Sequence, residues 1–123
     1  MSKVPVNIEL PVKGADALAL LEQLQAATEE EVEAFSHLQA CMTHRDDAKD
    51  HLNATRNDEW ATLPGSNDKA RESTFRSQNT ELFEVLARNE ADWRDANVRY
   101  HTASARAKAA RLTVRLLASV EDA

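Results

Sequence analysis

The 123-residue sequence predicts an all-α protein in which two long helices fold back on each other as an antiparallel coiled-coil hairpin. Three observations predict this fold class. The chain has only 2 glycines and 3 prolines, and all five lie outside two long stretches rich in Ala, Glu, Arg and Leu, a composition typical of long helices. Within each stretch, apolar residues recur in steps of three and four. One strong helix breaker, Pro64-Gly65, separates the two stretches.

The N-terminal segment has a different pattern from the rest of the chain. Residues 4–12 alternate apolar side chains with proline or polar ones, which is a strand pattern. Pro5 and Pro11 cannot donate a backbone hydrogen bond, so this segment is at best an edge strand. It could pair with a second copy, join a partner's sheet, or lie over the helices. We predict an extended partner-binding arm over residues 1–13, with contact residues Val4, Val6, Ile8 and Leu10.

The first long helix is predicted over about residues 16–61, within a helical domain that spans residues 14–123. Asp16 is a suitable N-cap, and four leucines between residues 18 and 24 give the helix an apolar face. Thr28 and Glu31 form a capping-box pattern, which favours a break near residue 28 over a helix that runs through. The apolar seam predicted for this helix contains Leu21, Leu24, Phe35, Leu38, Met42 and Leu52.

The second helix is predicted over residues 68–120, where the sequence has no Pro or Gly. Asn67 or Asp68 can cap its start. Its apolar seam alternates steps of four and three, which is a strong coiled-coil pattern. The seam residues are Phe75, Asn79, Leu82, Leu86, Asn89, Trp93, Ala96, Tyr100, Ala103, Ala107, Ala110, Val114 and Leu117.

Charge supports the antiparallel pairing. The net charge is -6, but residues 1–68 carry 5 basic and 13 acidic residues, whereas residues 69–123 carry 10 and 8. A turn near Gly65 places the acidic start of the first helix beside the basic end of the second. Each exposed pair contributes only about 0–1 kcal/mol, so these charges select register and orientation more than they add stability.

Two helices alone leave much apolar surface exposed to water. We therefore predict self-association as a homodimer, or a higher oligomer, that forms a four-helix bundle. The predicted core and oligomer residues are Phe35, Leu38, Leu82, Leu86, Trp93, Tyr100, Val114 and Leu117.

No catalytic residue, metal site or cofactor is predicted. Three histidines recur every seven residues from His37 to His51, about 10 Å apart along a helix, which is too far for a single metal ion. Cys41 is the only cysteine and is interpreted as a structural thiol. The sequence has no phosphate-binding glycine loop, no apolar run near ~18 residues and no apolar signal core. We expect a non-enzymatic, soluble, cytoplasmic protein without a membrane partner.

One segment of the second helix is an alternative functional site. Residues 94–115 contain six basic residues and one acidic residue, together with Tyr100. Such a stripe can bind a phosphate backbone, although the acidic patch of the first helix can also neutralise it. The residues of this possible nucleic-acid stripe are Arg94, Arg99, Arg106, Lys108, Arg111 and Arg115.

The turn and the start of the second helix, from Leu63 to Glu72, resemble those of small bacteriophage and prophage proteins. In such proteins two long helices flank a loop that is followed by an Asn-x-x-x-Arg-like helix start, matched here by Asn67 and Arg71. The resemblance implies a helical-hairpin accessory protein, in some cases encoded near recombination or replication functions. If the protein is viral, the expected compartment is the host cytoplasm.

These observations lead to three functional hypotheses. The first is a coiled-coil interaction or adaptor protein that binds a host factor, through the arm or through the hairpin end near Trp60 and Leu63. The second is a nucleic-acid-binding accessory protein of recombination or replication that uses the basic stripe. The third is a component of virion or tail assembly.

Overall fold

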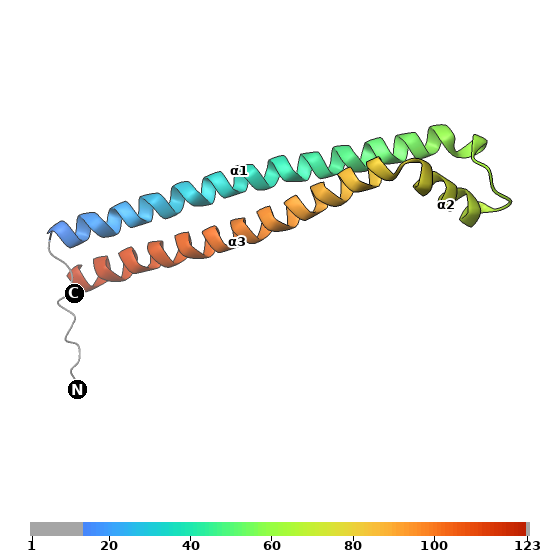
Figure 1. Cartoon of the computed structure of the whole chain (residues 1–123). Coiled ribbons are helices and arrows are strands. Elements are labelled where there is room, and N and C mark those ends of the chain that lie inside the picture. The colour runs from blue at the N-terminus through green and yellow to red at the C-terminus, as the bar shows by residue number, and fades with distance from the viewer. Residues whose placement is uncertain (1–13, 123) are drawn as a thin grey trace. The chain divides into compact units, whose positions relative to one another are not determined.

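The protein is an all-α helical hairpin, as a computed structural model describes for residues 14–122 (Figure 1). Helix α1 spans Gly14–Glu59, the 3₁₀ helix η2 spans Trp60–Thr62, α2 spans Asp68–Gln78 and α3 spans Thr80–Asp122. Residues 14–122 contain no strand. The predicted all-α fold is confirmed, whereas the predicted arm, with Val4, Val6, Ile8 and Leu10, lies outside the described residues.

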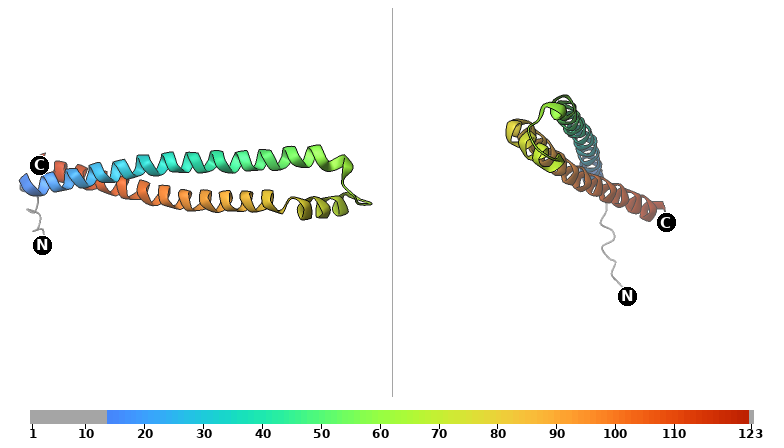
Figure 2. Two further views of the ribbon diagram at one scale, coloured as in Figure 1. Left: turned by 45° about the horizontal axis from the view of Figure 1, so that its top comes forward. Right: turned by 90° about the vertical axis from the view of Figure 1, so that its right-hand side faces the viewer.

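The helices form two compact units, and both long helices contribute to each. Unit 1 consists of the described residues up to Phe35 and from Arg99 onward, and unit 2 consists of Ser36–Val98. Within unit 1, the start of α1 lies beside the end of α3 (Figure 2), and the Phe35 and Tyr100 ring centroids are 5.4 Å apart.

Helix α1 is continuous over 46 residues, so the predicted break near Thr28 is wrong. No Gly or Pro interrupts the sequence between Gly14 and Pro64. Inside an intact helix each N–H finds a carbonyl four residues back, and no capping box is needed. The predicted bounds 16–61 also change, because the helix starts at Gly14 and ends at Glu59.

The buried side of α1 differs from the predicted seam. Leu38 is buried as expected, but Phe35 remains 45% exposed and Leu21 and Met42 are also exposed. Apart from Glu30 and Arg56, the residues shielded from solvent recur in steps of three and four. We call them the α1 seam: Ala17, Leu20, Leu24, Ala27, Glu31, Ala34, Leu38, Cys41, Arg45, Ala48, Leu52, Thr55 and Glu59.

On α3, the predicted seam matches the side that is shielded from solvent. Ala96, Ala103 and Ala107 are almost completely buried, and the larger seam residues between them are partly buried. The partly buried members of the predicted set are Leu82, Leu86, Trp93, Tyr100, Val114 and Leu117. We keep the name α3 seam for the positions from Leu82 to Leu117.

The turn end of unit 2 contains a compact apolar core. Leu52, Leu63 and Phe75 are buried together, and Phe75 is inaccessible to solvent. Trp60 and three apolar side chains of α3 pack against this cluster. Leu63 is therefore a core residue, which argues against the predicted docking role of this end.

The loop before α2 requires glycine at position 65. Gly65 has a φ of +148°, a backbone conformation that other residues rarely adopt. A Cβ atom at this position would lie 2.9 Å from the backbone nitrogen of Arg71. The Thr74 hydroxyl donates to the Pro64 carbonyl at 3.1 Å, and the Ala70 N–H donates to the Asn67 side chain at 2.9 Å, so Asn67 is the N-cap.

The helix predicted over residues 68–120 is divided at Asn79. Asn79 leaves the helical conformation, with φ -125° and ψ 36°. Its Nδ2 donates to the Phe75 carbonyl at 3.0 Å and to Glu59 Oε1 at 3.1 Å, and its carbonyl accepts from the Leu82 N–H at 3.0 Å. These hydrogen bonds replace those lost at the break, which is why the helix divides without Gly or Pro.

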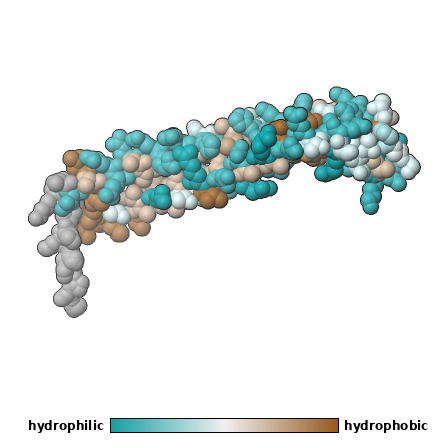
Figure 3. All heavy atoms as spheres, in the orientation of Figure 1, coloured by the Kyte–Doolittle hydropathy of each residue, from teal (hydrophilic) through white to brown (hydrophobic). Residues whose placement is uncertain are grey.

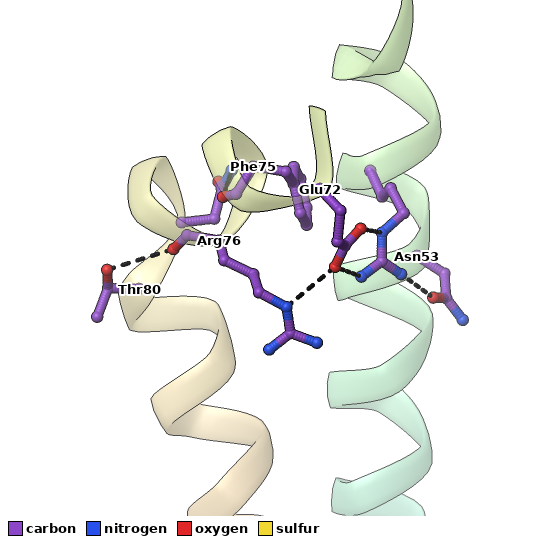
Figure 4. A network of polar contacts seen from close by, with 7 residues as sticks. Asn53, Glu72, Phe75, Arg76 and Thr80 are labelled. Carbon is purple, nitrogen blue, oxygen red and sulfur yellow. Dashed lines mark hydrogen bonds and ion pairs between the residues drawn. The ribbon is translucent and has the colours of Figure 1, made fainter. Parts of the chain in front are cut away.

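A network of ion pairs and hydrogen bonds connects α2 to α1 (Figure 4). The Arg56 guanidinium donates to both carboxylate oxygens of Glu72, at 3.1 and 2.9 Å. Arg76 Nε donates to the same carboxylate at 3.1 Å. Arg56 also lies 5.1 Å from the centre of the Phe75 ring, so the network covers the apolar core of unit 2.

Candidate interaction surface

Helix α1 carries an apolar stripe that faces solvent. Leu18, Leu21, Val32, Phe35 and Met42 are between 39% and 63% exposed. Each follows an α1-seam residue by one position, so the stripe lies about 100° round the helix from the seam. We define the α1 outer stripe, within unit 1, as Leu18, Leu21, Gln25, Thr28, Val32 and Phe35, which keep steps of three and four.

Helix α3 carries a second exposed stripe. Val98, Leu112, Leu116 and Val120 are each more than half exposed. The exposed positions that follow the α3 seam by two residues lie about 200° round the helix, on the side away from α1. We define the α3 outer stripe, within unit 1, as Thr102, Ala105, Ala109, Leu112, Leu116 and Ser119.

Among the described residues of unit 1, the buried side chains are all small. They are Ala34, Ala103 and Ala107, whereas six leucines or valines of the same unit are more than half exposed. In Figure 3, hydrophobic residues gather where α1 begins and α3 ends. Burial of a leucine stabilises by about 1.5–3 kcal/mol, and an alanine side chain has far less area to bury. Unit 1 thus leaves several of its large apolar side chains in water.

The acidic and basic ends of unit 1 are joined by ion pairs. Glu30 accepts two hydrogen bonds from Arg99, at 3.0 and 2.8 Å, and Glu31 accepts one from Arg111 at 3.5 Å. The hydrogen bond from Arg99, aided by its charge and that of Arg106, lowers the pKa of Glu30 below its usual 4.5. The same hydrogen bond raises the pKa of Arg99. The pairing predicted from charge is therefore present.

We expect a Glu30→Gln variant to be slightly less stable than the wild type at pH 7, with a smaller difference at pH 3. A carboxyl whose pKa is lower in the folded state stabilises that state above its unfolded pKa, and this contribution disappears as pH falls through the folded pKa. Urea unfolding at the two pH values measures the difference, with Glu22→Gln as the control because Glu22 forms no ion pair with any residue between 14 and 122. A difference of the same size at pH 3 as at pH 7 would contradict this assignment.

The basic stripe is only partly available to a ligand. Arg99 and Arg111 are paired with glutamates of α1. The other four, Arg94, Arg106, Lys108 and Arg115, are exposed and form no ion pair with a side chain between residues 16 and 120. Two of the six basic residues of the stripe are thus neutralised by ion pairs with α1.

His37, His44 and Cys41 border a groove within unit 2. Cys41 is buried, with its Sγ 3.7 Å from His37 Nε2. The groove has a volume of about 440 Å³, and Asp92 and Asp95 line its α3 side. Within the described range, no three His, Cys, Asp or Glu side chains are placed to hold a metal ion. None of the described helices has a stretch long and apolar enough to cross a bilayer.

Sequence reasoning missed the two outer stripes. Leu21, Phe35 and Met42 belong to the exposed stripe of α1, yet their apolar character placed them on the predicted buried seam. The signal was a second three-and-four repeat, offset from the seam by one residue on α1 and by two residues on α3.

Comparison with known proteins gives no further assignment. No protein-family model matches this chain, and neither curated proteins nor solved structures yielded a significant match.

Proposed function

We propose that this chain is a non-enzymatic helical interaction protein that associates with itself and presents the resulting assembly to a protein partner. The observation that carries the proposal is the contrast within unit 1 between its alanine core and its exposed leucines and valines. Monomeric proteins rarely leave contiguous apolar surface of this kind in water. Stripes with heptad spacing fit other helices, because each side chain inserts between four residues of a partner helix.

The assembly expected from this surface is a dimer with four helices, in which the second copy covers the exposed apolar stripes. A role as a phage-type accessory or host-factor-binding adaptor, or in virion assembly, is consistent with such an assembly. These roles share the requirement that self-association comes first, so the oligomeric state is the first property to measure.

Replacement of Leu112 and Leu116 together by Glu is expected to convert the assembly into monomers. Both side chains are more than half exposed in the single chain, so the substitutions remove little folding energy but place charge in the contact. Light scattering on a sizing column measures the mass, and circular dichroism checks that helicity is retained.

The matched control replaces Thr113 and Ala118 by Glu. These positions are also exposed on α3 and add the same charge off the stripe, so the assembly should persist. A wild-type chain that elutes with the mass of one copy at micromolar concentration would refute the proposed self-association.

Nucleic-acid binding is the second candidate, favoured by the exposed and unpaired state of Arg106, Lys108 and Arg115 within the described range. It predicts that a short single-stranded oligonucleotide co-migrates with the protein at low salt and is released as salt rises. Charge reversal at Arg106 should weaken that complex. An elution profile unchanged by the oligonucleotide would favour the protein-adaptor function.

A further inference from the structure

We infer that the α1 outer stripe of one copy packs antiparallel against the α3 outer stripe of a second copy, in one register. This inference rests on the proposed function and names the partner surface and its orientation. Within one chain the two stripes cannot meet, because the α3 outer stripe lies on the side of α3 away from α1. Each copy therefore offers two unpartnered helix faces, and the second copy supplies the complement to both.

The spacing of the two stripes defines the register. The α1 outer stripe read forward from Leu18 and the α3 outer stripe read backward from Ser119 have their steps of three and four in the same order. This match allows the side chains of two antiparallel helices to interlock along the whole contact. The level pairs are Leu18 with Ser119 of the second copy, Leu21 with Leu116, Gln25 with Leu112, Thr28 with Ala109, Val32 with Ala105 and Phe35 with Thr102.

Side-chain sizes are complementary at several levels of this register, although Leu21 and Leu116 are both large. The two bulkiest α1 residues toward the unit boundary, Val32 and Phe35, lie level with the small Ala105 and Thr102 of the second copy. Leu112 lies level with the flexible side chain of Gln25. Large side chains opposite small ones allow the close, void-free packing that protein interiors show.

Charge favours α1 against α3 over either helix against its own copy. Residues 14–35 carry six acidic residues and no basic one, whereas residues 99–120 carry five basic residues and no acidic one. Two α1 stripes together would bring like charges side by side. In the inferred register, Glu29 and Arg106 of the second copy each follow a stripe residue by one position, so they flank the contact on the same side. Neither forms an ion pair within the described part of its own chain.

The two stripes are different surfaces. Two copies can therefore make the contact twice with each other in a closed dimer, or each copy can bind a further copy in a longer assembly. Either arrangement brings the same residue pairs together. The inference therefore concerns which side chains meet, and it is independent of the final number of copies.

Disulfide trapping between two differently tagged chains tests the register. Cys41 is first replaced by Ala in both chains, so that the introduced thiols are the only ones. One chain then carries Val32→Cys and the other Ala105→Cys, and they are refolded together and oxidised. We expect a cross-linked heterodimer to form at least tenfold faster than when Gln25→Cys replaces Val32→Cys. Gln25 lies on the same stripe but about 10 Å along the helix, beyond the reach of a disulfide.

A third pair, Val32→Cys with Leu116→Cys, detects the parallel orientation, in which these two positions are level. Faster cross-linking of this pair, or equal rates for all three pairs, would overturn the inference. Light scattering on the unoxidised samples distinguishes a wrong register from an absence of self-association. A stable oligomer without the expected preference refutes only the register, whereas a monomer refutes self-association as well.

Discussion

Replacement of Phe75 by Ala should lower the free energy of unfolding by about 3–5 kcal/mol, the usual cost of removing a buried aromatic ring. Phe75 is completely buried, contacts Phe83 edge-on with ring centroids 5.9 Å apart, and forms the turn-end core with Leu52 and Leu63. Small proteins are typically stable by only about 5–15 kcal/mol, so this one change removes a large part of the total.

Tryptophan fluorescence during urea unfolding measures this effect directly, because Trp60 and Trp93 both lie in unit 2. Trp60 also packs against the core that contains Phe75. The control is Val98→Ala, at a position that is 66% exposed in the same unit, and it should cost less than about 0.5 kcal/mol. Similar losses for the two variants would show that Phe75 does not hold this core together.

Replacement of Ala107 by Leu should destabilise unit 1 by about 1–3 kcal/mol, because an enlarged side chain at a closed position strains the packing. Ala107 is completely buried and belongs to the α3 seam. The added atoms have no free space there, so α3 must move away from α1.

Two spectroscopic signals distinguish the unfolding of unit 1 from that of unit 2 in this variant. Circular dichroism reports helix in the whole chain, whereas the tryptophans report unit 2 alone. The unfolding curve of Ala107→Leu should therefore shift further by circular dichroism than by fluorescence. Ala91→Leu, an exposed position of α3, is the matched control and should leave both curves unchanged. Equal shifts of both signals in Ala107→Leu would indicate that the two units unfold as one.

Strong local signals made much of the hairpin predictable from sequence. Pro64 and Gly65 marked the turn, and Gly65 does adopt a backbone conformation that requires glycine. The α3 seam followed from a repeat in which nearly every step was filled by an apolar or small residue. On α1 two such repeats overlap, one residue apart, and hydrophobicity alone does not say which one faces α3.

The break predicted near Thr28 is absent, and an unpredicted break occurs at Asn79. In both places the local sequence alone does not decide whether the helix breaks. The Thr28–Glu31 pattern is a favourable helix start, but a favourable start does not compel a break where the chain before it is also helical. Asn79 has a modest helix propensity, and its break is stabilised by hydrogen bonds that include one to Glu59, twenty positions away. The residues next to Asn79 in the sequence do not reveal such a contact. The outer stripes were missed for a similar reason, since exposure is decided by the neighbouring helix.

The ion pairs also differ in the length of chain that they enclose, which bears on the order of folding. Arg56 and Glu72 are 16 residues apart, whereas Glu30 and Arg99 are 69 apart and Glu31 and Arg111 are 80 apart. Closing a loop five times longer costs about 1.4 kcal/mol more in chain entropy, so the turn end is expected to form first. At synthesis rates of about 5–20 residues per second, the first segment of α1 leaves the ribosome roughly 4–16 s before its partner on α3 exists. During that interval its leucines have only other chains, or a chaperone, to contact.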